Sequence, residues 1–196
     1  GNDESKWSKY AGDPNYNILN ECCLAINFGN PGATGFNKIN QKTMDYMINE
    51  GPGREAFVLF WKLMAEAVVD HPSAFAVEFM NEPMTIYRKE AFNTWRAAAE
   101  VVNSIIPDMA VSFMDTGESS LIPSWAEKLA SFLGLGIRID KETEDWIKNS
   151  GTAYYAWHWY HSPPSTAEEA AKNALQISKD WNIPAFATEF GSCDVW

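Results

Sequence analysis

The stretch REAFVLFWKLMAEAVVDHPSAFAVEFMNEP, residues 54–83, predicts a helix that leads directly into a buried strand. Apolar residues recur at helical spacing from Phe57 to Val68. Pro72 ends this pattern, because the residue before a proline avoids the helical region. The apolar run Phe75–Met80 has the length of a strand that is covered on both faces. A helix followed by such a strand is one unit of a parallel α/β sheet.

The same unit recurs along the rest of the chain. We expect further strands at Ala110–Met114, Thr152–Tyr160 and Ala185–Phe190. We expect the helices near Lys89–Ile106, Ser124–Leu133 and Glu142–Lys148, and from Ser165 to about Trp181. The last of these helices opens on Ser165 and Glu168, which have the spacing of a capping box. Helices that alternate with buried strands predict a parallel sheet.

The predicted fold class is therefore α/β, a (β/α)8 TIM barrel of which this chain holds a part, covering about strands 4 to 7. A complete barrel needs about 250 residues, and the chain has 196. We expect a single partial domain over residues 1–196, with a long irregular loop region at 1–54, rich in Asn, Gly, Asp and Pro, and β/α repeats at 55–196. We expect both ends to lie within a longer chain.

Composition narrows the classes of partner. The formal net charge is −11 and is spread along the sequence, which argues against binding nucleic acid or an anionic membrane. No apolar run is long enough to predict a transmembrane segment. The three cysteines, at positions 22, 23 and 193, fit neither a disulfide framework nor a zinc pattern. A neutral substrate such as a sugar chain is compatible with the acidic charge.

Two glutamates end predicted strands in the same way. Glu82 follows the Phe75–Met80 strand within Asn81-Glu82-Pro83, and Glu189 lies at the end of the Ala185–Phe190 strand. In parallel α/β folds, residues at the C-terminal ends of strands line the active-site mouth. The two glutamates are 189 − 82 = 107 residues apart, which is three β/α units. A retaining glycoside hydrolase needs such a pair, one as acid/base and one as nucleophile, about 5–5.5 Å apart.

The motifs FMNEP, HWY and ATEFG, on three predicted strands, resemble glycoside hydrolase family 5 over about residues 55–193. The resemblance implies that Glu82 is the acid/base and Glu189 the nucleophile. Asn81 matches the residue that hydrogen-bonds the sugar 2-hydroxyl. Tyr160 matches the residue that holds the nucleophile, and His158 matches one that contacts substrate or orients the pair.

The resemblance implies a cellulase-like or β-glucanase-like enzyme without a cofactor, which cleaves β-linked O-glycosidic bonds of a polysaccharide, oligosaccharide or glycoconjugate by double displacement. It also implies a secreted or extracellular protein, although this chain has no signal peptide. The sequence departs from the family pattern in two respects. We find neither the early strands, one of which supplies an arginine near the nucleophile, nor strand eight.

Several alternatives stay open. The chain could be a non-catalytic carbohydrate-binding protein on a degenerate or truncated barrel, and transglycosylation would use the same two glutamates. Glu78 lies deeper in its strand than Glu82, and we expect it to form buried hydrogen bonds. His158 could equally be a core histidine with satisfied hydrogen bonds. We expect no metal site, because His158 and His161 have poor ligand spacing on a strand and turn.

Overall fold

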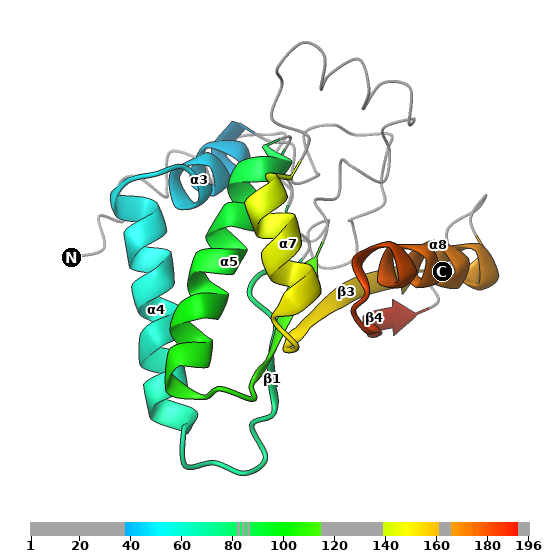
Figure 1. Cartoon of the computed structure of the whole chain (residues 1–196). Coiled ribbons are helices and arrows are strands. Elements are labelled where there is room, and N and C mark those ends of the chain that lie inside the picture. The colour runs from blue at the N-terminus through cyan, green and yellow to red at the C-terminus, as the bar shows by residue number, and fades with distance from the viewer. Residues whose placement is uncertain are drawn as a thin grey trace. The chain divides into compact units, whose positions relative to one another are not determined.

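We describe the protein from a computed structural model (Figure 1), which describes residues 38–81, 83, 85, 87–114, 139–160 and 166–191. The chain divides into two compact units, Gly1–Lys42 and Thr43–Trp196. The elements are α3 (Lys38–Ile48), α4 (Pro52–Val68), β1 (Ala76–Val77), α5 (Arg88–Ile105), β2 (Ala110–Met114), α7 (Lys141–Asn149), β3 (Ala153–Tyr160), α8 (Ala167–Trp181) and β4 (Ala185–Gly191).

The predicted fold class is confirmed. The four strands form one sheet in the order β1-β2-β3-β4, and every neighbouring pair is parallel. Helix α5 connects β1 to β2, α7 precedes β3, and α8 connects β3 to β4 (Figure 1). The sheet is curled, as expected for half of a (β/α)8 barrel.

The first strand is shorter than predicted. The expected strand Phe75–Met80 is reduced to Ala76 and Val77, which pair with the start of β2. The next ladder position is altered, because the backbone N–H of Phe79 donates to the side-chain oxygen of Ser112 at 3.0 Å. A side-chain hydroxyl thus replaces a backbone acceptor. The other three strands agree with their predicted bounds to within one residue.

The expected irregular region at 1–54 is wrong for its last part. Residues 38–48 form α3, and α4 already begins at Pro52. The apolar pair that anchors α3 is Met44 and Ile48, both buried. Helix α3 also lies close to the start of α4, since a Cβ atom on Gly53 would collide with the Tyr46 carbonyl oxygen. Residues 1–37 and the expected helix Ser124–Leu133 lie outside the described residues.

Helix α8 begins with a capping box one residue later than predicted. The Thr166 hydroxyl oxygen accepts a hydrogen bond from the Glu169 backbone N–H at 3.2 Å, and the Glu169 carboxylate accepts from the Thr166 backbone N–H at 3.0 Å. Both orphan donors of the first turn are thereby satisfied. Glutamates stand at both 168 and 169, so the sequence allows two registers for the box.

A chain of aromatic contacts joins three helices to the sheet. Phe113 of β2, fully buried, contacts Trp146 of α7 at 5.8 Å and Phe92 of α5 at 5.9 Å between ring centroids. Phe92 contacts Trp181 of α8 at 5.5 Å, and Trp181 contacts Tyr155 of β3 at 6.0 Å. Aromatic pairs at these distances add to the stability that comes from burial of their area. The helix-facing side of the sheet is therefore the main core.

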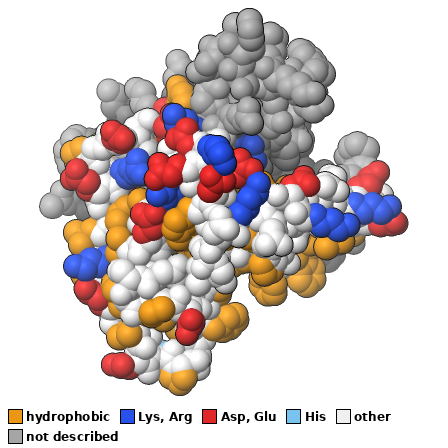
Figure 2. All heavy atoms as spheres, viewed as in Figure 1, with side chains coloured by type: hydrophobic (Ala, Val, Ile, Leu, Met, Phe, Trp, Pro, Cys, Tyr) orange, Lys and Arg blue, Asp and Glu red, His pale blue; other side chains and the backbone are white. Residues whose placement is uncertain are grey.

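Charged side chains of both signs mix on the surface that α5 and α7 form (Figure 2). Arg96 of α5, for example, lies 2.8 Å from Glu100 and 2.7 Å from Glu142. Exposed pairs of this kind contribute little to stability. Within the described part of the chain, no helix combines the length and the apolar character needed to cross a membrane.

We predict that Phe113→Ala lowers the free energy of unfolding by about 3–5 kcal/mol, because it removes a buried ring and leaves a cavity. The matched control is Phe186→Ala on the opposite side of the sheet, where the ring is 61% exposed. That change should cost about 0.5 kcal/mol or less. Urea unfolding followed by circular dichroism measures both values, and equal losses would contradict the assignment of the core.

We predict that Thr166→Ala lowers the free energy of unfolding by about 1 kcal/mol, because the first turn of α8 loses its cap. Ser165→Ala is the matched control and should have almost no effect. The same urea titration distinguishes the two registers of the capping box. If Ser165→Ala instead lowered the free energy of unfolding more than Thr166→Ala, the result would support the Ser165–Glu168 capping box that the sequence predicts.

Candidate functional site

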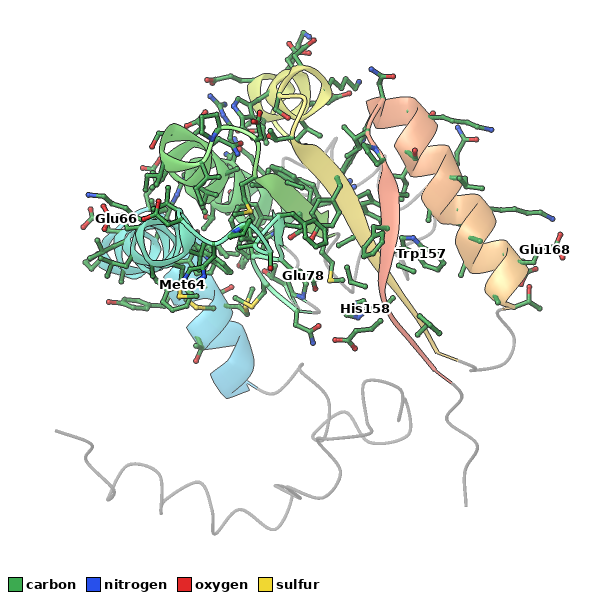
Figure 3. All side chains as sticks on the ribbon, turned by 90° about the horizontal axis from the view of Figure 1, so that it is seen from below. Met64, Glu66, Glu78, Trp157, His158 and Glu168 are labelled. Carbon is green, nitrogen blue, oxygen red and sulfur yellow. The ribbon has the colours of Figure 1, made fainter. Side chains whose placement is uncertain are left out.

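The sheet has one face turned toward the helices and one turned away from them. Val111, Phe113 and Tyr155 belong to the core beneath the helices, so their neighbours along the strands face the other way. Figure 3 shows this alternation on β3, where Trp157 and His158 lie on opposite sides of the strand. We call this second side the inner face, and it carries Ser112, Met114, Tyr154, Ala156, His158, Phe186 and Glu189.

Glu189 reaches the inner face because β4 contains one extra residue. Trp157 pairs with Ala187, but the next residue of β3, His158, pairs with Glu189, so that Thr188 is skipped. Regular alternation from Phe186 would have turned Glu189 toward the helices. A bulge of this kind changes the direction of a side chain and is often found beside active sites.

Three ionisable side chains meet on this side of the sheet. The His158 ring is 8% exposed, and its Nε2 atom lies 3.7 Å from the Glu78 carboxylate. Its Nδ1 atom lies 3.7 Å from the Glu189 carboxylate. The side chains of Glu78 and Glu189 are 24% and 39% exposed. In Figure 3, the side of β3 that carries His158 is the side nearer to Glu78. We call these three residues the Glu–His–Glu cluster.

Tyr154 lies on the same side, four residues before His158. Its hydroxyl donates to the Val77 carbonyl oxygen at 3.1 Å, and so reaches from β3 across β2 to β1. Burial, the largest cause, and the negative charge of Glu78 both raise the pKa of the Tyr154 hydroxyl, a hydrogen bond with Ser112 lowers it, and together they place it at about 12. Glu78 and Tyr154 are therefore electrostatic neighbours.

The structure brings some of the predicted site residues together. Glu189 and His158 lie side by side on adjacent strands. Asn81 is exposed beyond the end of β1, and Tyr160 pairs with Gly191 in the sheet. The side chain of Tyr160 and the whole of Glu82 lie outside the described residues, so their roles remain predictions.

Sequence reasoning did not include Glu78 in the site. We expected it to form buried hydrogen bonds, whereas its side chain is partly exposed and contacts His158. Alternation along the strand already placed Glu78 on the same side as Glu82, but its deeper position in the strand argued against a role in the site. Proximity to His158 was invisible in the sequence, because the two residues are 80 positions apart in the chain, 158 − 78 = 80.

Other features of the described residues do not extend the site. Among these residues, no group of three or more His, Cys, Asp and Glu side chains could hold a metal ion. A cleft of about 650 Å³ lies on the outside of α4 and includes Arg54, Leu59 and Val101. A smaller one of about 270 Å³ is lined by charged residues such as Arg96 and Asp140. The residues that line these two clefts do not belong to the inner face.

No protein-family model matches the sequence, and no curated protein matches it either. Among solved structures, the chain is similar to the catalytic domain of the Thermobifida fusca endoglucanase Cel5A (E5), with 20% sequence identity and a TM-score of 0.48. The match covers 76% of this chain and 42% of that domain.

We predict that Tyr154 makes stability depend on pH above about pH 10. An unfolded tyrosine loses its proton near pH 10, whereas folded Tyr154 keeps it up to about pH 12. The contribution of this group is therefore fully present below pH 10 and is lost as the pH rises toward 12. Relative to Tyr154→Phe, the unchanged chain should lose about 1 kcal/mol of unfolding free energy between pH 10 and 11. Urea unfolding at pH 9, 10 and 11 tests this, and parallel curves for the two proteins would refute it.

Proposed function

We propose that this chain carries the catalytic residues of a retaining glycoside hydrolase that cleaves β-linked O-glycosidic bonds. The observation that carries the proposal is the pairing of Glu189 with His158 on the inner face, at the C-terminal end of parallel strands. Active sites of parallel α/β barrels lie at this end. Glu189 is 39% exposed, so a substrate can reach its carboxylate, while the His158 ring beside it is buried.

The proposed mechanism has two steps. Glu189 attacks the anomeric carbon while Glu82 protonates the leaving oxygen, which gives a covalent glycosyl-enzyme and a free alcohol. Glu82 then takes a proton from water, which attacks the same carbon, breaks the bond to Glu189 and restores both carboxyl groups to their starting states. Asn81 binds the sugar 2-hydroxyl, and Tyr160 and His158 orient the nucleophile.

The chain offers an acidic setting for this chemistry. Glu78 and Glu189 supply two carboxylates to one short stretch of the inner face, and the chain as a whole has a net charge of −11. The transition state of glycoside cleavage resembles an oxocarbenium ion and carries positive charge at the sugar ring. Preorganised negative groups stabilise such a charge more than they stabilise the neutral substrate.

The test is mechanism-based labelling of the full chain with a panel of 2-deoxy-2-fluoro β-glycosides that carry a dinitrophenyl leaving group. We expect one sugar to be attached to Glu189, identified by mass spectrometry of a peptic digest. Glu189→Gln should abolish labelling. Glu82→Gln should still be labelled, because dinitrophenolate leaves without protonation, whereas its kcat on an unactivated glycan should fall by about 10²–10⁴-fold.

Glu66→Gln is the matched control, since Glu66 lies on α4 in a surface pair with Lys62. This variant should be labelled like the unchanged protein. Attachment of the sugar to another residue would overturn the assignment of the nucleophile. Binding of oligosaccharides in calorimetry, with no labelling by any probe of the panel, would favour the non-catalytic carbohydrate-binding protein instead.

A further inference from the structure

We infer that Glu78 is a positioning residue that acts on Glu189 through the buried ring of His158. The inference rests on the proposed function in one respect, namely that Glu189 is the nucleophile. It adds a third carboxylate to the site, one that the motifs at the strand ends do not mark. The Glu–His–Glu cluster would then work as a unit in which each end of the imidazole ring faces one carboxylate.

The two contacts involve different nitrogen atoms of one ring. Nε2 of His158 lies 3.7 Å from Glu78, and Nδ1 lies 3.7 Å from Glu189. At 3.7 Å neither contact is a hydrogen bond, so each carboxylate acts on the ring through its negative charge. A carboxylate at each nitrogen therefore favours the charged ring. The charged ring in turn offers Glu189 a fixed positive neighbour, because it is only 8% exposed and has little freedom to turn away.

Hydrogen bonds on either side hold the backbone of Glu78 in place. The carbonyl oxygen of Val77 accepts from the Tyr154 hydroxyl at 3.1 Å, and the N–H of Phe79 donates to the Ser112 hydroxyl at 3.0 Å. Both partners belong to the inner face. The residue between these two bonds is Glu78, so its backbone is fixed relative to β2 and β3 although the β1 ladder has already ended at Val77. This is the arrangement expected of a residue that must hold a neighbour in position.

The described surroundings of His158 contain few other groups that could set its charge. Glu78 approaches from the segment after β1, and Glu189 approaches from β4. Tyr154 lies four residues earlier on β3 itself and stays protonated at neutral pH, because its pKa is raised to about 12. From β2, the inner face receives Ser112 and Met114, which carry no charge. Glu78 and Glu189 are therefore two charged groups, from two different segments, that lie beside the His158 ring.

The experiment is a titration of the histidine side chains in the 15N-labelled full chain by NMR, between pH 5 and 9. In Glu78→Gln, which keeps the shape and removes the charge, the titration midpoint of His158 should fall by about one pH unit. In Glu78→Asp, which keeps the charge, the fall should be clearly smaller. Glu66→Gln and Glu168→Gln, two surface changes on α4 and α8 (Figure 3), should leave the midpoint unchanged.

An unchanged His158 midpoint in Glu78→Gln would overturn the inference, and so would an equal fall in the Gln and Asp variants, because charge would then not be the cause. The second readout is the rate at which the 2-fluoro probe labels Glu189. Glu78→Gln should slow labelling about tenfold or more with little change in probe affinity, since a small misplacement of a reacting group can cost up to about 10²-fold. Failure of the unchanged chain to react with any probe concerns the proposed function alone, since the midpoints are measured without substrate.

Discussion

The structure depends first on the burial of one side of its sheet by aromatic side chains. Phe113 and Tyr155 face the helices, and the ring contacts that run from them through Phe92 and Trp181 hold α5 and α8 against β2 and β3. Because strand residues alternate, fixing these residues on the helix side fixes their neighbours on the inner face. The inner face is therefore determined by the core beneath the helices, whose residues lie on the opposite side of the sheet.

The alternation that this core imposes is broken at one place, and the candidate site depends on the break. The extra residue Thr188 turns Glu189 from the helix side to the inner face, where it meets His158. Curling of the sheet brings a second carboxylate, that of Glu78, to His158. On a curled sheet a side chain of β3 can reach across β2 to the segment at β1. Tyr154 does so to Val77, and His158 does so to Glu78. A flat sheet with regular pairing would bring neither glutamate to this ring.

Much of the fold could be predicted from the sequence, because helices and buried strands leave periodic patterns over ten or more residues. The shortening of β1 could not, since it depends on a hydroxyl of Ser112 in a different strand. The shift at Thr188 depends on the pairing of two strands and leaves no sign in either one alone. Helix α3 was missed because it is short and its buried residues, Met44 and Ile48, cover only one turn, so the apolar pattern does not repeat. Errors therefore fell where structure depends on contacts between distant segments.

The candidate site also combines residues that a sequence pattern marks with a residue that only the structure reveals. Glu189 and His158 follow strand-end patterns that a sequence displays, whereas Glu78 is recognisable only when three strands are seen together. Two carboxylates near one another repel, and a site that needs both ionised must supply a positive group between them. A histidine whose two nitrogens each face one carboxylate meets this need. In the proposed mechanism, the charged His158 ring would keep Glu189 ionised, and the ionised carboxylate is the form that attacks the anomeric carbon.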